Sequence, residues 1–427
     1  MTRHFDKFIL VLVILLILTG LTAVYSSTAV VSPALEQKGK AINASVNQFS
    51  YLKKQFFTVL IGIAAMFAAC KVPLSWLKKL VIPLLVVSIV SLLLVFTSLG
   101  ISAGGARRWL RLWPSSFQPS ELVKLSMVIF LAWYMSLGSH NKEKFISFIV
   151  PILVMAAFQA VFLKQPDFGA TMSLAVLTVA MLFLSGIRLR YLFSLGLVAL
   201  PVVIKLVSEP YRWKRVVAFL DPWKDPQGSG FQLTQSFIAF GSGGLQGVGL
   251  GESKQKLSFL PEVHTDFIFS LIGEELGFIG AAIVVTLFFC LFIRGFMIAR
   301  KLQDPFAYYL ASGISLMIAI QSVFNFAVVT GLVPTKGLPL PFISYGGSSL
   351  VISMIAAGLL LNVSRFMEGT NQASEVLHVR SRQPERMESD NGTAPKVSQY
   401  TFGRGYGQCR PDDRRKSGFF RKSSKRP

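Results

Sequence analysis

The sequence has few of the residues that soluble proteins use for metal centres, disulfide frameworks and charged surfaces. Among 427 residues there are three cysteines and four histidines. Cys70, Cys290 and Cys409 are far apart and lack metal-ligand spacing, which argues against a disulfide framework and a structural zinc site. Charged residues make up 15% of the chain, against about a quarter in soluble globules, and 52% of residues are hydrophobic. The composition therefore indicates a membrane protein.

The apolar residues are concentrated in long runs. A run of about 18 or more apolar residues can cross a bilayer as a helix. The first run follows Arg3 and Lys7 as a signal peptide would, but its apolar core is long, so it is interpreted as an uncleaved helix. The sequence predicts an all-α integral membrane protein with ten transmembrane helices, at 8–26, 55–73, 79–99, 117–137, 145–163, 169–187, 190–207, 267–293, 306–328 and 345–365.

The distribution of Lys and Arg predicts the orientation. Ten spans place both termini on one side, and most of the 43 Lys and Arg residues lie in the loops and the tail on that side. The positive-inside rule then makes both termini cytoplasmic. A large extracytoplasmic loop, 208–266, separates the seventh and eighth spans of the membrane domain, 1–367. The basic, Ser- and Gly-rich segment 368–427 is predicted to be a disordered cytoplasmic tail that contacts anionic lipids and not nucleic acid.

Three clusters of cations lie on the predicted outer side, where the positive-inside rule expects few. Contact with anionic lipid headgroups would explain them. A site for an anionic, lipid-linked substrate would also explain them, because Arg pairs closely with phosphate oxygens. The clusters are Arg107, Arg108 and Arg111 beside Trp109; Arg212, Lys214 and Arg215; and Lys254 and Lys256.

The outer loop is also rich in glycine between residues 228 and 251. Glycine permits tight turns and a close approach of the backbone to a ligand. The stretch contains no G-x-x-x-x-G-K-[ST] pattern, so it is not a nucleotide-binding P-loop. Within it, FQLTQSFIAF has apolar residues near helical spacing and is predicted to form an interfacial helix.

Charged residues also occur inside the predicted spans, where each costs at least a few kcal/mol unless it is paired. Glu121 and Lys124 are three residues apart on one helix face and can neutralise each other. Lys124 can instead pair with Asp167, which follows Pro166 at a break between two spans. The residues leave both pairings open, and we predict the interhelical pair of Lys124 with Asp167.

The stretch LPEVHTDFIFSLIGEELG, residues 260–277, carries three carboxylates into the eighth span. On a continuous helix, Glu274 and Glu275 lie about 12 Å deeper than Asp266. The three carboxylates therefore do not form one site. Asp266, beside His264, can cap the helix. Because it lies level with the cation clusters, it is also placed to act as a general base. The two glutamates are predicted to be structural.

Five motifs resemble the SEDS family, in order and from the first span to about residue 367: GARRW, QPSELVKL, KQPDFGAT, GVGLGESKQKLSFLPEVHTDFIFSLIGEELG and KGLPLPFISYGGSS. The resemblance implies polymerisation of lipid II into peptidoglycan glycan strands, usually with a class B penicillin-binding protein. It places the essential aspartate at Asp266 and a membrane-embedded pair at Lys124 and Asp167. It also places the family's arginine–tryptophan pair at Arg108 and Trp109. Together with the outer cations and His264, the predicted substrate-binding residues are Arg107, Arg108, Trp109, Arg212, Arg215, Lys256 and His264.

The implied reaction needs no nucleotide and no covalent intermediate. A divalent cation, Mg or Mn, can assist by binding the lipid diphosphate that leaves the donor sugar, but the sequence shows no ligand cluster for it. The motifs resemble the division-type members more than the elongation-type ones. The resemblance thus implies an inner-membrane enzyme at the septum, with other divisome proteins as partners. The alternatives are an elongation polymerase, a lipid II flippase, since buried ions also mark transport paths, and a scaffold.

Overall fold

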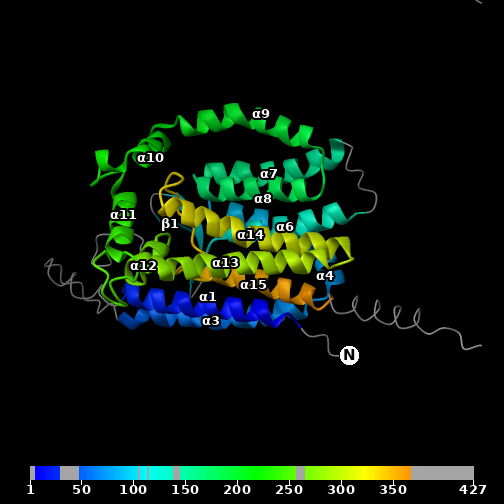
Figure 1. Cartoon of the computed structure of the whole chain (residues 1–427). Coiled ribbons are helices and arrows are strands. Elements are labelled where there is room, and N and C mark those ends of the chain that lie inside the picture. Colours follow the sequence, from blue (N-terminus) through cyan, green and yellow to red (C-terminus); the bar gives the residue numbers. More distant parts are fainter. Residues whose placement is uncertain are drawn as a thin grey trace, which may run out of the picture. The chain divides into compact units, whose positions relative to one another are not determined.

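The computed structural model describes residues 5–28, 48–103, 106–112, 115–137, 145–255 and 265–366, and these are mostly helical (Figure 1). The predicted tail, Lys256 and His264 lie outside the described residues. The helices are α1 (Lys7–Thr28), α3 (Gln48–Lys71), α4 (Leu74–Lys79), α5 (Val81–Leu94), α6 (Pro119–Ser136), α7 (Phe145–Lys164), α8 (Phe168–Leu184), α9 (Leu189–Val207), α10 (Pro210–Leu220), α11 (Phe231–Gly243), α12 (Ile268–Glu275), α13 (Gly277–Arg300), α14 (Pro305–Val329) and α15 (Gly347–Ser364).

Helices lie over all ten stretches that the sequence predicts as spans. Seven are long and apolar enough to cross a membrane, namely α1, α3, α7, α9, α13, α14 and α15. The apolar helices α5 and α8 are shorter, and α6 carries Glu121 and Lys124 in its first two turns. The all-α membrane class is therefore confirmed, and the count of ten crossings stays a prediction.

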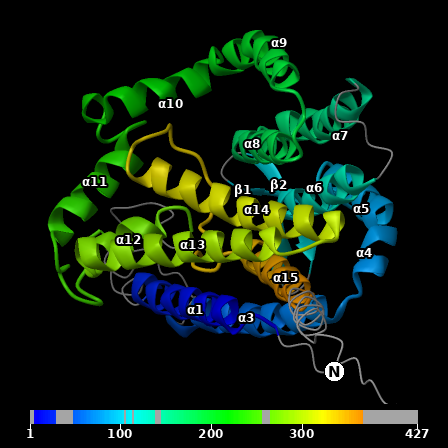
Figure 2. The ribbon, with the colours of Figure 1, turned by 45° about the vertical axis from the view of Figure 1, so that its right-hand side comes forward.

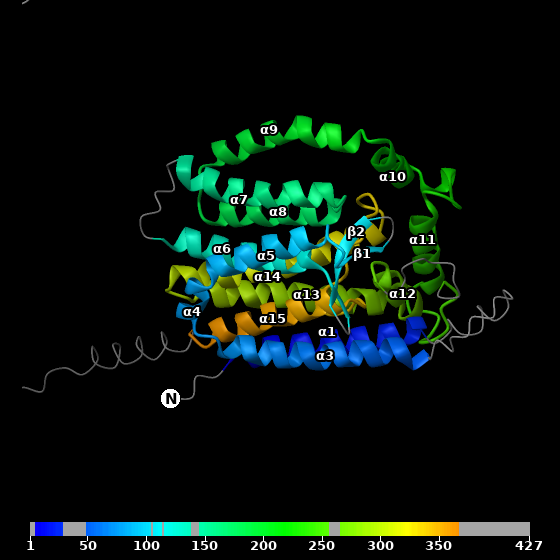
Figure 3. The same cartoon turned by 180° about the vertical axis from the view of Figure 1, so that it is seen from behind.

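The helices α14 and α15 form the centre of the described part. Helix α15 packs against α3, and α14 packs against α6, α13 and α8. In the most apolar stretch of α15, 83% of the residues are buried, whereas none are buried in the corresponding stretch of α9. The views agree on this order: α1 and α3 lie on one side of α13 and α15, and α7, α8 and α9 lie on the other (Figures 1, 2 and 3). The outward apolar side chains of α9 are those expected of a helix in contact with lipid.

A small antiparallel sheet is an element that the sequence analysis missed. Its strands are β1 (Gly100–Ala103), β2 (Ala106–Leu112) and β3 (Ser115–Phe117), in the order β1-β2-β3. In the register, Arg107 is opposite Ser102 and Trp109 is opposite Ile101. The first cluster of predicted outer cations is thus carried by a strand, and the register shifts between Ile101 and Ser102, so that Arg108 is the extra residue of a β-bulge.

The predicted continuous span 267–293 is wrong in one respect, because the chain breaks between α12 and α13. Gly277 has a φ of +66°, a conformation that glycine adopts at little cost. The glycine-rich segment after α11 supplies the hydrogen bonds that the break removes. The N–H groups of Phe278 and Ile279 donate to the carbonyls of Gly244 and Leu245 at 2.9 and 3.2 Å. In return, the N–H groups of Val248 and Gly249 donate to the carbonyls of Glu274 and Glu275 at 3.0 and 3.1 Å.

Glycine is required at this contact because two backbones meet. A Cβ atom at Gly243 would lie 2.0 Å from the carbonyl oxygen of Gly273. At Gly247, which has a φ of +83°, a Cβ atom would lie 2.2 Å from the carbonyl oxygen of Glu275. These glycines therefore serve a close backbone approach, as predicted, but to another segment of the protein. We call the segment 243–249 the glycine staple.

Candidate active site

Asp266 lies in the turn before α12 and is partly buried. The N-cap of α12 is Phe267, and it makes no side-chain capping hydrogen bond. The Asp266 carbonyl accepts a 2.8 Å hydrogen bond from the Nδ2 of Asn325 in α14, which also donates to the carbonyl of Leu338. A Cβ atom at Gly337 would lie 2.7 Å from the Oδ2 of Asp266. The carboxylate therefore lies against the backbone of the loop that joins α14 to α15.

The loop between α14 and α15 is fixed from both sides. The Ser344 hydroxyl donates to the carbonyl of Thr265 at 2.6 Å and accepts a 2.8 Å hydrogen bond from the N–H of Leu340. The Nη1 of Arg215 in α10 donates to the carbonyl of Thr335 at 3.2 Å. Ser344, in the motif KGLPLPFISYGGSS, thus ties this loop directly to the turn that carries Asp266.

Three cations, from β2, α10 and the loop between α14 and α15, meet around the turn between α7 and α8, and Arg215 of α10 lies near one of them, Lys336. The Nζ of Lys336 lies 4.2 Å from the centroid of the Phe168 ring, and the guanidinium carbon of Arg212 lies 5.6 Å from the same centroid. The Nη2 of Arg108 donates to the carbonyl of Pro166 at 2.6 Å, two residues before Phe168. We call Arg108, Arg212, Arg215 and Lys336 the outer cation group.

Lys336 is a member of this group that the sequence analysis did not single out. It stands in the motif KGLPLPFISYGGSS, and the signal available was a cation in a loop between two predicted spans. Burial lowers the pKa of Lys336 from 10.5 to about 8, and the nearby charge of Arg215 adds to this. Two cations held this close favour an anion between or beside them.

Arg108 and Arg212 are partly occupied by the protein itself. Arg108 also directs its Nε to the carbonyl of Gln165 at 3.5 Å, so one edge of its guanidinium holds the turn before α8. The Nη1 of Arg212 donates to the carbonyl of Leu206 at 2.9 Å. Trp109 is partly buried on the neighbouring position of β2, and Arg107 is exposed. The structure thus brings Arg108 and Arg212 to the turn before α8, with Arg215 near Lys336, and Arg107 is exposed.

The predicted pair of Lys124 with Asp167 is wrong. The Nζ of Lys124 lies 2.8 Å from the Oε1 of Glu121, within one helix. The Oε2 of Glu121 accepts a 3.2 Å hydrogen bond from Gln321 in α14. The Oδ1 of Asp167 instead accepts the N–H of Ala170 at 3.0 Å and caps α8. The short spacing on one helix decided the pairing, since it needs no adjustment between helices.

Glu274 and Glu275 are buried and face different neighbours, as their position predicts. Glu274 accepts hydrogen bonds from the hydroxyl of Ser253 and from the N–H of Lys254, the latter at 3.0 Å. Glu275 accepts one from the hydroxyl of Ser26 in α1. Within the described part of the chain, no three His, Cys, Asp or Glu side chains lie close enough to hold a metal ion. The divalent cation at the diphosphate stays a prediction.

Comparison with known proteins shows which family the chain resembles. A family described as "Cell cycle protein", which covers FtsW, RodA and SpoVE, matches residues 6–369. The probable peptidoglycan glycosyltransferase FtsW of Geobacter sp. (strain M18) is 42% identical over 368 residues, which cover 86% of this chain and 98% of that protein. Stage V sporulation protein E of Bacillus subtilis (strain 168) is 40% identical over 368 residues, covering 84% and 97%.

Solved structures show the same fold. A chain from a peptidoglycan synthase complex that coordinates polymerization and crosslinking has a TM-score of 0.68 and 28% identity, with 85% of this chain and 98% of that chain covered. The rod shape determining protein RodA of Thermus thermophilus has a TM-score of 0.62 and 26% identity, with 84% and 97% covered. Sequence and fold agree over nearly the whole length of these relatives, and the chain belongs to the FtsW/RodA/SpoVE family of cell cycle proteins.

Proposed function

We propose that this protein is a peptidoglycan glycosyltransferase that polymerises lipid II during septal wall synthesis, with Asp266 as general base. The observation that carries the assignment is the contact of the Asp266 carboxylate with the loop that presents Lys336. One loop thereby places a base beside the outer cation group. Glycosyl transfer from a diphosphate donor needs this combination, a base for the acceptor and positive charge for the leaving group.

In the proposed reaction, Asp266 takes the proton of the 4-hydroxyl of the acceptor N-acetylglucosamine. The hydroxyl oxygen forms a bond to the anomeric carbon of the donor's muramic acid, while the bond from that carbon to the lipid diphosphate breaks. The leaving diphosphate carries the electron pair away, and Arg212, Arg215 and Lys336 stabilise its charge. Arg108 uses one edge of its guanidinium to hold the turn at Pro166 and so fixes the wall of the site.

The partners follow from the same relatives. The similar chain in the peptidoglycan synthase complex supports a class B penicillin-binding protein as the transpeptidase partner. The relatives of highest identity quoted above are FtsW and a sporulation protein, whereas RodA is 26% identical, which supports the division role over the elongation role. We therefore place the protein in the bacterial inner membrane at the septum, with both termini in the cytoplasm and other divisome proteins beside it.

The test is polymerisation of labelled lipid II by the purified protein together with its penicillin-binding partner. Asp266→Asn keeps the size of the side chain and removes its basicity, so glycan synthesis should fall on the order of 10²-fold or more. Glu252→Gln, at an exposed carboxylate of the same outer loop, is the matched control and should retain activity. Wild-type rates with Asp266→Asn would refute the base. A protein that moves lipid II across vesicles without polymerising it would favour the flippase.

A further inference from the structure

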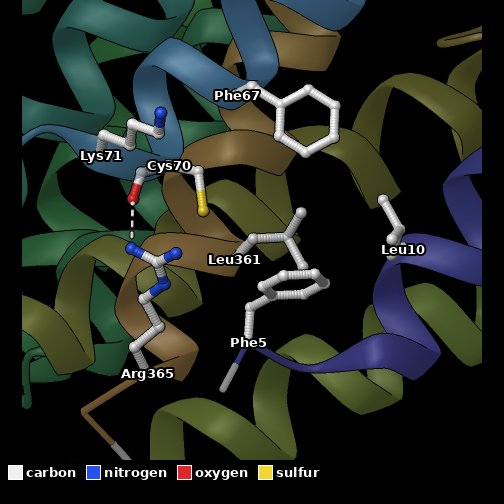
Figure 4. Close-up of a pocket in the computed structure, with 7 residues that line it drawn as sticks. All are labelled: Phe5, Leu10, Phe67, Cys70, Lys71, Leu361 and Arg365. Carbon is white, nitrogen blue, oxygen red and sulfur yellow. Dashed lines mark hydrogen bonds between the residues drawn. The ribbon is translucent and has the colours of Figure 1, made fainter. Parts of the chain in front are cut away.

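A pocket lies far along the helices from Asp266, where the start of α1 meets the ends of α3 and α15. It is a small pocket, open on one side, with room for a small group such as a phosphate. Figure 4 shows its apolar wall, formed by Phe5, Leu10, Phe67 and Leu361, and two cations on one side, Lys71 and Arg365. This end of the bundle is the one predicted to face the cytoplasm.

The guanidinium of Arg365 has hydrogen-bonding capacity that the protein does not use. Its Nη1 donates to the carbonyl of Cys70 at 3.2 Å. Its Nε is buried and has no hydrogen-bond partner. In Figure 4 the Nη1 points to the Cys70 carbonyl, and the edge formed by Nε and the other terminal nitrogen faces Leu361 and Phe5. That edge is the one with which arginine binds two oxygens of a phosphate, and a buried donor without an acceptor is costly.

The ends of α3 and α15 explain only part of this arrangement. Cations near helix C-termini are stabilised by the helix dipole, and the contact of Arg365 with Cys70 is of this kind. Two other cations at this end have carboxylate partners: Arg294 binds Asp6 at 2.7 Å, and Lys78 binds Asp304 at 3.4 Å. Among the described residues, neither Lys71 nor Arg365 forms an ion pair. The pocket therefore has positive charge, an unused donor edge and an apolar wall.

We propose that this pocket binds the headgroup of an anionic phospholipid from the cytoplasmic leaflet. The phosphate would accept hydrogen bonds from the free edge of Arg365, with Lys71 adding charge at the exposed rim. The first carbons of the lipid would lie along Phe67 and Leu10. The site is separate from the proposed glycosyl transfer, so either assignment can fail without the other.

The experiment is native mass spectrometry of the full chain in detergent with added phosphatidylglycerol, and with phosphatidylcholine as the zwitterionic comparison. The wild type should bind phosphatidylglycerol more tightly than phosphatidylcholine. Arg365→Gln should weaken phosphatidylglycerol binding about ten-fold or more, because charge-assisted hydrogen bonds are lost. Lys71→Gln should weaken it about five-fold. Lys79→Gln, an exposed cation at the end of α4 that does not line the pocket, is the control and should bind as the wild type does.

Three outcomes would overturn the proposal. One is equal binding of phosphatidylglycerol by the wild type, Lys71→Gln and Arg365→Gln. Another is no preference for phosphatidylglycerol over phosphatidylcholine in the wild type. In the third, inorganic phosphate binds through Lys71 and Arg365 and the lipid does not, which makes the pocket a site for small anions. If Arg365→Gln does not fold, Lys71→Gln decides, since that side chain is exposed.

Discussion

Replacing Lys124 by Met should strand a buried carboxylate and destabilise the bundle strongly. Lys124 is 1% exposed and Glu121 is 3% exposed, with 2.8 Å between Nζ and Oε1. At that distance and an effective dielectric of about 20, two unit charges attract by about 6 kcal/mol. Desolvation offsets much of this attraction. Removing only the lysine should nevertheless cost about 3–5 kcal/mol, because the charge of Glu121 remains in the interior.

Adding the second substitution should recover most of that loss. Glu121→Gln with Lys124→Met leaves no buried charge, and the new amide can still accept from Gln321. We expect the double variant to lie within about 1–2 kcal/mol of the wild type, which corresponds to a coupling energy of at least about 2 kcal/mol. The matched cycle uses Asp167→Asn with Lys124→Met. Asparagine is a good N-cap, so this cycle should be additive within about 0.5 kcal/mol.

The measurement is the free energy of unfolding in detergent micelles for each variant of both cycles, under one set of conditions. The reasoning predicts strong coupling for Lys124 with Glu121 and none for Lys124 with Asp167. The reverse result would mean that the interhelical pair exists in the protein after all. Additive behaviour in both cycles would show that Lys124 carries no buried charge, and the assignment of the ion pair would be refuted.

Three further predictions concern the site and its support. The kcat/KM for lipid II should fall as the pH rises through about 8, because Lys336 loses its charge there. Since the pKa of Lys336 is lower in the folded protein than in the unfolded chain, the free energy of unfolding relative to Lys336→Gln should increase between about pH 8 and 10.5, by at most about 3.4 kcal/mol. In thermal unfolding, Gly243→Ala should destabilise the protein by about 1–3 kcal/mol or more. Gly241→Ala, in the same helix, should stabilise it slightly, because a Cβ atom there would have no neighbouring atom within 4 Å; equal changes in melting temperature for the two variants would contradict the glycine staple. Arg108→Lys should lower lipid II turnover almost as far as Arg108→Ala at matched protein levels, because an ammonium cannot hold two carbonyls as the guanidinium does; full activity of Arg108→Lys would refute this.

Much of the protein could be predicted from the order of residues alone, where the physics is local. A long apolar run must form a helix in a bilayer, since its backbone hydrogen bonds have to be made within the segment. Helices are accordingly found at all ten predicted stretches. The position of Asp266 before a helix and the burial of Glu274 and Glu275 were predicted in the same way, from their distance along one segment.

The tertiary structure decided what depends on contacts between distant segments. Glu121 and Asp167 were both possible partners of Lys124 by depth, and only the packed side chains show that the carboxylate on the same helix binds it. The break after Glu275 forms because the glycine staple, some 30 residues earlier, supplies the missing backbone hydrogen bonds. Lys336 joins the outer cation group because its loop is held against Asp266 by residues of other helices. Hydropathy and spacing carry no record of such contacts, since their free energy arises only when the helices are packed together.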